Sequence, residues 1–312
     1  MDKRFFYDNK RYHTLFLYNM NTFGQRVYKA PIDAGFSCPN IDGTRGRGGC
    51  IYCNGGSGYF AVERSLSVSR QLELQIKRIH EKHEGAKVIA YFQSFSNTHA
   101  PLCVLRDVFE PVFDNEFVVG ISVATRADCI DESKVEYLSC LAEKTKLTVE
   151  LGLQSVHDST AKLINRCHSF SEFEKAYFLL KKSGIRVCVH IINGLPDETE
   201  EMMLETASVL GKMKPDALKI HSLHILKGTE LEKMYLEGKY KPISKDFYVE
   251  TVVNQLELIP VQTVIERLTG DADKSLLVAP EWSKNKIAVL GAIDRLQAQR
   301  NSYQGVKSDF QR

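Results

Sequence analysis

The sequence predicts an α/β fold built from repeated βα units. Six candidate strands, which lie in short β-like runs, are separated by segments whose apolar residues recur at helical spacing. These strands lie at residues 26–32, 88–93, 117–125, 147–153, 186–192 and 217–224. Right-handed connections between them give either a doubly wound sheet or an open, partial (β/α) barrel. In both architectures the chemistry gathers beyond the C-terminal ends of the strands.

Helical spacing is found at residues 68–84, 132–144, 172–182 and 200–212, and Gly184 follows the third of these segments as a helix-ending glycine would. Two more helices are predicted at residues 245–258 and 284–299. We therefore divide the chain into a basic, aromatic N-terminal segment (residues 1–25), an α/β domain (residues 26–228) and an α-rich C-terminal extension (residues 229–312).

The composition is that of an ordinary globular protein, with 43% hydrophobic and 26% charged residues in 312. The most apolar runs, residues 117–125 and 187–196, are too short to cross a bilayer. Near the N-terminus, Phe5, Phe6 and Tyr7 stand among charged residues and do not form the apolar region of a secretion signal. We expect a cytoplasmic protein with no membrane partner.

Both ends of the chain are basic, although the net charge is only +2. Residues 1–30 carry a net charge of +4 and residues 281–312 a net charge of +3. These charges indicate either contact with nucleic-acid phosphates or a solvated surface. Aromatic rings interleave with the first basic segment and could stack on bases or cover one end of a barrel. They are Phe5, Phe6, Tyr7, Tyr12, Phe16 and Tyr18.

Three of the eight cysteines lie in one glycine-rich segment after the first strand, in the pattern C-x11-C-x2-C. In a chain without a secretion signal, such cysteines are read as thiols or metal ligands. A structural zinc site would need a fourth ligand, and none is well spaced nearby. A [4Fe-4S] cluster held by three cysteines leaves one iron open to a further ligand. We therefore predict that Cys38, Cys50 and Cys53 bind a metal centre.

The strand predicted at residues 147–153, together with Gln154 after it, carries polar side chains on one face. Glu150, Gly152 and Gln154 share that face because side chains alternate with a period of two. Buried Glu and Gln side chains need hydrogen-bond partners, which a bound cofactor can supply. We expect this face to line a cavity.

The cysteine loop, with Tyr52 just before its last cysteine, resembles that of the radical S-adenosylmethionine (SAM) enzymes. The long first spacing is similar to that of the Elongator-catalytic-subunit-like group and, within it, of the YhcC/YtqA-type proteins. The resemblance implies a partial (β/α)6 TIM-like barrel, a [4Fe-4S] cluster and SAM as cofactors.

The same resemblance assigns roles to individual residues. Gln154 is expected to hold the ribose of SAM, and the planar guanidinium of Arg166 suits the carboxylate of its methionyl part. Residues 93–98 occupy the place of the family's methionine-amino contact, and residues 193–199 that of the turn near the adenine. The residues predicted to contact the cofactor are Tyr52, Gln93, Ser96, Asn97, Glu150, Gln154, Arg166, Asn193 and Gly194. On the substrate side we predict His224, as a general acid or a hydrogen-bond donor.

The resemblance implies hydrogen abstraction by a 5′-deoxyadenosyl radical, with tRNA as the partner and a reduced flavodoxin or ferredoxin as the electron donor. The implied substrate is the side chain of wobble 2-thiouridine, which would be converted from 5-carboxymethylaminomethyl to 5-aminomethyl. One alternative is a small-molecule substrate such as a porphyrinogen. Another is a non-catalytic, zinc-containing tRNA-binding protein.

Overall fold

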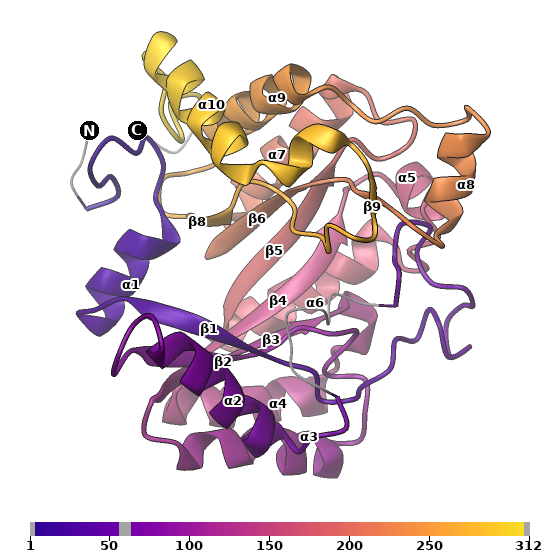
Figure 1. Cartoon of the computed structure of the whole chain (residues 1–312). Coiled ribbons are helices and arrows are strands. Elements are labelled where there is room, and N and C mark those ends of the chain that lie inside the picture. Colours follow the sequence, from indigo (N-terminus) through magenta and orange to yellow (C-terminus); the bar gives the residue numbers. More distant parts are fainter. Residues whose placement is uncertain (1–3, 56–63, 309–312) are drawn as a thin grey trace.

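A computed structural model of the chain describes residues 4–55 and 64–308. Its centre is a seven-stranded parallel sheet that curls into half a barrel, with helices against its outer side (Figure 1). The order across the sheet is β1-β2-β3-β4-β5-β6-β8. The strands are β1 (Val27–Ile32), β2 (Lys87–Phe92), β3 (Val118–Thr125), β4 (Lys146–Gln154), β5 (Arg186–Asn193), β6 (Ala217–Ser222) and β8 (Val264–Arg267). The predicted α/β partial barrel is confirmed.

The seventh strand is the main difference from the expected (β/α)6 barrel. β8 comes from the C-terminal extension and pairs in parallel with β6, where Lys219 lies opposite Arg267. With four residues, β8 is too short to show a period in the sequence, so its pairing is decided by tertiary contacts. A separate two-stranded sheet joins β7 (Ile225–Leu226) to β9 (Leu277–Ala279).

The six predicted helices are all present. They are α2 (Val68–His80), α4 (Glu132–Lys144), α6 (Phe170–Lys182), α7 (Glu200–Met213), α9 (Lys245–Leu258) and α10 (Lys286–Gln299). Ser169 and Glu172 form a capping box that begins α6. The helices that sequence periodicity missed have six to nine residues, too few for a clear pattern. They are α1 (Leu15–Phe23), α3 (Leu102–Phe109), α5 (Asp158–Leu163) and α8 (Glu230–Leu236). No helix in the described ranges is long and apolar enough to span a bilayer.

The two basic ends pack against each other (Figure 1). The amide of His13 donates to Gln304 Oε1 at 2.8 Å, and Lys10 Nζ lies 2.6 Å from Asp294 Oδ2. Of the predicted aromatic set, Phe6 and Tyr12 are buried within the protein, so these two rings are not free to stack on bases. Tyr7 is 53% exposed. Lys3 of the N-terminal basic segment lies outside the described residues.

Candidate active site

A cavity of about 620 Å³ lies at the C-terminal ends of the strands and extends down into the half-barrel. Most of the residues singled out from the sequence line it. They are Cys38, Cys50, Tyr52, Cys53, Gln93, Ser96, Glu150, Gln154, Arg166 and His224. The alternation expected in β4 is confirmed: Glu150, Gly152 and Gln154 face the cavity, whereas Val149, Leu151 and Leu153 belong to the hydrophobic core.

The cysteine loop is tightly folded by its own backbone. The amide of Cys53 donates to the carbonyl of Cys50 at 2.9 Å, and the amide of Ile41 to the carbonyl of Cys38 at 2.8 Å. Gly46 is required by close packing, because a Cβ there would lie 2.4 Å from Asn40 Oδ1 and 2.8 Å from the sulfur of Cys167. The amide nitrogen of Asn40 in turn contacts Cys50 Sγ at 3.6 Å.

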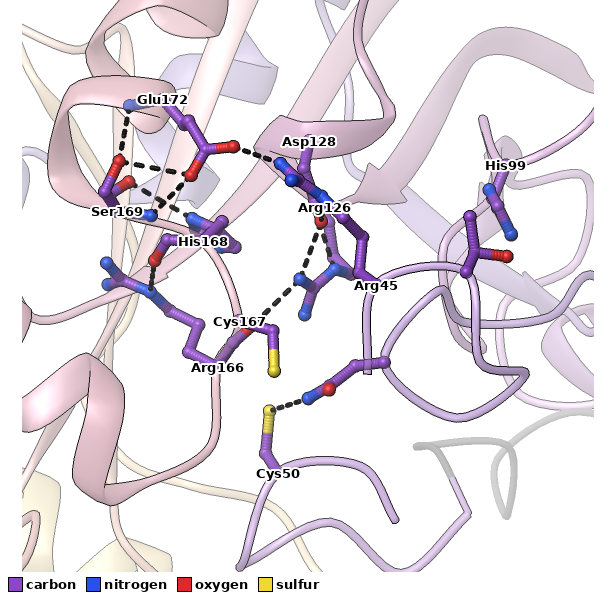
Figure 2. Close-up of polar contacts among 12 residues, drawn as sticks. Arg45, Cys50, His99, Arg126, Asp128, Arg166, Cys167, His168, Ser169 and Glu172 are labelled. Carbon is purple, nitrogen blue, oxygen red and sulfur yellow. Dashed lines mark hydrogen bonds and ion pairs between the residues drawn. The ribbon is translucent and has the colours of Figure 1, made fainter. Parts of the chain in front are cut away.

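Two residues that sequence reasoning did not assign to the site lie beside this loop (Figure 2). Arg126 binds Asp128 through two nitrogens, at 2.9 and 2.8 Å, and donates to the carbonyl of Arg166 at 2.8 Å. Its positive charge acts on both Cys38 and Cys50. Cys167 points toward Cys50 in Figure 2. The sequence feature that could have indicated Arg126 is its position directly after β3, at the edge of the sheet where the parallel strands end.

Arg166 is held rigidly, yet part of its guanidinium is unsatisfied. Nε donates to the carbonyl of His168 at 3.0 Å, and Nη1 donates to the carbonyls of Leu153 and Ser155. Nη2 is buried without a hydrogen-bond partner among the described residues and lies 3.8 Å from Asp158 Oδ1. A buried hydrogen-bond donor without a partner lowers the stability of the protein, and an anionic ligand would accept its hydrogen bond.

The loop after β2 also carries unsatisfied polar atoms. Ser96 Oγ is buried at the cavity wall with no hydrogen-bond partner in the described part of the chain. Asn97 does not line the cavity: its amide nitrogen donates to the carbonyls of Ser94 and Ala124, at 3.0 and 2.9 Å. We call the cysteine loop, Ser96, Gln154 and Arg166 the rim of the cavity.

Asn193 and Gly194 are not among the residues that line the cavity. The Asn193 side chain is paired with the amide of Gln255 in both directions, at 2.8 and 2.9 Å. The carbonyl of Gly194 accepts from Tyr240 at 2.6 Å. The expected contacts of these two residues with SAM stay predictions.

Deeper in the half-barrel, the carboxylate of Glu150 is surrounded by donors. Its Oε1 accepts from Lys29 and Ser122, both at 2.7 Å. Its Oε2 accepts from Tyr91 at 2.9 Å and from Lys219, and lies 2.8 Å from the ring nitrogen of His190. Burial alone would raise the pKa of Glu150, but Lys219 and Lys29 hold it well below its usual range. Its predicted contact with the cofactor stays a prediction.

A second buried carboxylate, Glu266, continues this network. It accepts from Lys29 at 2.8 Å and from Arg186 at 3.0 Å. Despite burial, Lys29 and Arg186 lower the pKa of Glu266 to about 2. Both carboxylates are therefore ionised at neutral pH. We call the group formed by Lys29, Glu150, Arg186, Lys219 and Glu266 the charged floor.

His190, His221 and His224 all line the cavity. His190 contacts Glu150, and the rings of His190 and His221 have centroids 5.3 Å apart. His224 Nε2 lies 3.2 Å from Ser222 Oγ. Burial lowers the pKa of His224 to about 4, so its ring is neutral at pH 7. This charge state fits a hydrogen-bonding role, and the role of His224 stays a prediction.

The cysteines fit a cluster better than a single ion. In residues 4–55 and 64–308, no three His, Cys, Asp or Glu side chains stand close enough to bind one metal ion. Cys38, Cys50 and Cys53 instead face a common cavity. Burial raises the pKa of Cys50 to about 11, and a metal centre bound there would favour its thiolate.

Family models match two parts of the chain. The model of the radical SAM superfamily matches residues 41–210, which include Cys50, Cys53 and Arg166, and that of the Radical_SAM C-terminal domain matches residues 215–298. The first match covers more than half of the chain. The protein therefore belongs to the radical SAM superfamily.

Within this superfamily the chain is similar to the uncharacterized protein YtqA of Bacillus subtilis (strain 168). The two are 50% identical over 297 residues, which are 95% of this chain and 92% of YtqA. This likeness places the chain in the same subgroup as YtqA.

Two more distant similarities are a sequence match and a solved structure. The chain is 29% identical over 163 residues to the tRNA uridine(34) acetyltransferase of Methanocaldococcus infernus, a match of 51% of this chain and 30% of that protein. A solved structure of M. infernus Elp3 with an N-terminal deletion has a TM-score of 0.68 at 18% identity, covering 89% of this chain and 64% of that one. This structural likeness supports the partial-barrel fold.

Enzymes of this superfamily use a [4Fe-4S] cluster and SAM. In this chain, Cys38, Cys50 and Cys53 would hold the cluster. The buried Nη2 of Arg166 is suited to the carboxylate of SAM. When bound, the cluster and SAM supply a 5′-deoxyadenosyl radical that abstracts a hydrogen atom from an unactivated carbon.

Proposed function

We propose that this radical SAM enzyme modifies the side chain of a wobble uridine in tRNA. The observation that carries the proposal is the similarity, over half of the chain, to a tRNA uridine(34) acetyltransferase. The basic charges of residues 1–30 and 281–312 support it, because such charges contact phosphates.

The proposed reaction is hydrogen abstraction from the methylene of a 5-carboxymethylaminomethyl group on 2-thiouridine. Loss of a proton and of one further electron, taken up by a one-electron acceptor such as the oxidised cluster, would give an imine at the carboxymethyl carbon. Its hydrolysis by water would release glyoxylate and leave 5-aminomethyl-2-thiouridine. The proposal includes a reduced flavodoxin or ferredoxin as the electron donor and the cytoplasm as the location.

The chain's own residues would position the reactants. Arg166 and Gln154 would hold the carboxylate and the ribose of SAM at the rim, and Ser96 would offer a further polar contact. The fixed position of Arg166, set by three backbone carbonyls, restricts how the cofactor can turn. The cavity beneath would receive the flipped wobble base and shield the reacting carbon from water.

The test compares tRNA nucleosides from a deletion strain and its parent. We expect 5-carboxymethylaminomethyl-2-thiouridine to accumulate in the deletion strain and the 5-aminomethyl product to disappear. The chromosomal wild-type gene should restore the product, whereas a Cys50→Ala copy should not. Identical nucleoside profiles in the deletion strain and its parent would overturn the proposal.

A further inference from the structure

Arg267, a positively charged residue at the cavity wall, has few interaction partners among the described residues. The guanidinium of Arg267 donates no hydrogen bond to any residue in the described ranges. It lies 4.0 Å from Asp271 Oδ2, but the other oxygen of that carboxylate accepts from Lys286. The side chain is 36% exposed and lines both this cavity and a second one of about 320 Å³.

The surroundings of Arg267 carry an excess of positive charge. The charged floor contains Lys29, Arg186 and Lys219 against two carboxylates, and Arg267 acts electrostatically on Lys219. Burial lowers the pKa of His190 and His221, so both rings are neutral at pH 7 and add no charge. Lys286 balances Asp271, and Asp273 also lines the cavity, so the group holds one more positive than negative charge.

Strand register places Arg267 at a defined depth. Across the sheet, Gly152 lies opposite His190, His190 opposite Lys219, and Lys219 opposite Arg267. All four residues face the cavity. Since Gly152 precedes Gln154 along β4, this row lies below the rim. A ligand group at this depth lies beneath the position proposed for SAM.

An excess of positive charge at a half-buried site is unfavourable until a counter-charge arrives. A carboxylate matches a guanidinium with two parallel hydrogen bonds, whereas a neutral group does not. We propose that Arg267, backed by the positive charge of the floor, forms a subsite that binds a carboxylate of the substrate.

The inference rests on the proposed function for the identity of the molecule that carries the carboxylate. In that function, the carboxymethylamino group is the part of the wobble side chain that would reach Arg267. The carboxylate lost in the reaction is then the group by which the substrate is recognised, and the amine product would leave because it no longer fits the subsite.

The test uses two small probes, N-acetylglycine, which has a carboxylate, and its neutral analogue N-acetylglycinamide. Their binding to the reconstituted enzyme is measured by ligand-observed NMR, with saturating SAM so that the cofactor's own carboxylate fills its site. We expect the wild type to bind N-acetylglycine about tenfold more tightly than N-acetylglycinamide, because only the carboxylate forms a charge-assisted pair with Arg267. Arg267→Gln should remove this preference, and Arg267→Lys should keep part of it, because charge remains but the planar fork is lost.

Arg70→Gln is the matched control, since Arg70 is an exposed arginine on α2 whose side chain is 58% accessible. It should keep the full preference. Thermal unfolding of Arg267→Gln should match that of the wild type, because the arginine makes only a long ion pair. Equal binding of the two probes by the wild type, or a preference retained in Arg267→Gln, would overturn the inference.

A second measurement separates this inference from the proposed function. Filter binding compares tRNA that carries the 5-carboxymethylaminomethyl group with tRNA that carries the 5-aminomethyl group. Failure to bind either tRNA, with the small-probe preference intact, would overturn the tRNA substrate and leave the carboxylate subsite. Tight binding of both tRNAs without discrimination, and no small-probe preference, would overturn the subsite and leave the tRNA substrate.

Discussion

At the rim of the cavity, Ser96 Oγ and Arg166 Nη2 are buried without hydrogen-bond partners among the described residues, whereas at the floor five donors surround the carboxylate of Glu150. The rim keeps polar atoms unsatisfied until a ligand arrives, a state that costs stability. The floor pairs both of its carboxylates, Glu150 and Glu266, within the protein. The difference teaches that one cavity can combine a ligand-dependent region with a region that is preorganised without ligand.

The largest effect is expected at the rim, from Cys50→Ala. Loss of one of three thiolates should open the cluster, so that iron content falls and 5′-deoxyadenosine formation drops to background. The measurement is the iron count and nucleoside yield after anaerobic reconstitution. Cys103→Ala is the control, because Cys103 is exposed and does not line the cavity, and it should keep both values. A fully active Cys50→Ala enzyme would contradict the assignment of the cluster.

At the floor, Glu150→Gln should act on folding. It leaves Lys29 and Lys219 beside an uncharged amide, and breaking a buried ion pair costs about 3–5 kcal/mol of unfolding free energy. Urea unfolding of the protein measures this loss. As a control, Glu73→Gln removes an exposed pair with Arg70 and should cost less than about 1 kcal/mol. A loss below 1 kcal/mol for Glu150→Gln would show that the floor tolerates unpaired lysines.

The smallest effects come from one chemical change made in both regions. Ser122→Ala removes a 2.7 Å hydrogen bond to Glu150 and should cost about 1.5–3 kcal/mol of unfolding free energy. Ser96→Ala removes a hydroxyl that makes no hydrogen bond to the described residues, so stability should change by less than about 0.5 kcal/mol. SAM affinity should fall severalfold in Ser96→Ala and stay constant in Ser122→Ala. Equal losses of stability in the two variants would remove the distinction between rim and floor.

The sequence predicted the rim better than the floor, for a physical reason. Cys50 and Cys53 are neighbours in one loop, and the polar face of β4 follows from its period of two, so both are local signals. The floor joins residues that are far apart: Lys29 is 121 positions from Glu150 and 237 from Glu266. No local pattern in one sequence reveals such pairs. The same holds for Arg267, which reaches the cavity through a strand of four residues.

The contact between the two ends of the described chain has a consequence for synthesis. The amide of His13 donates to Gln304, a residue made 291 positions later. At roughly 5–20 residues per second, a ribosome needs on the order of 15–60 s to cover that distance. During this interval Tyr12 and Phe6, buried in the finished protein, lack the C-terminal surface against which they pack, including Tyr303. These rings therefore lack their C-terminal contacts until the residues that follow α10 have left the ribosome.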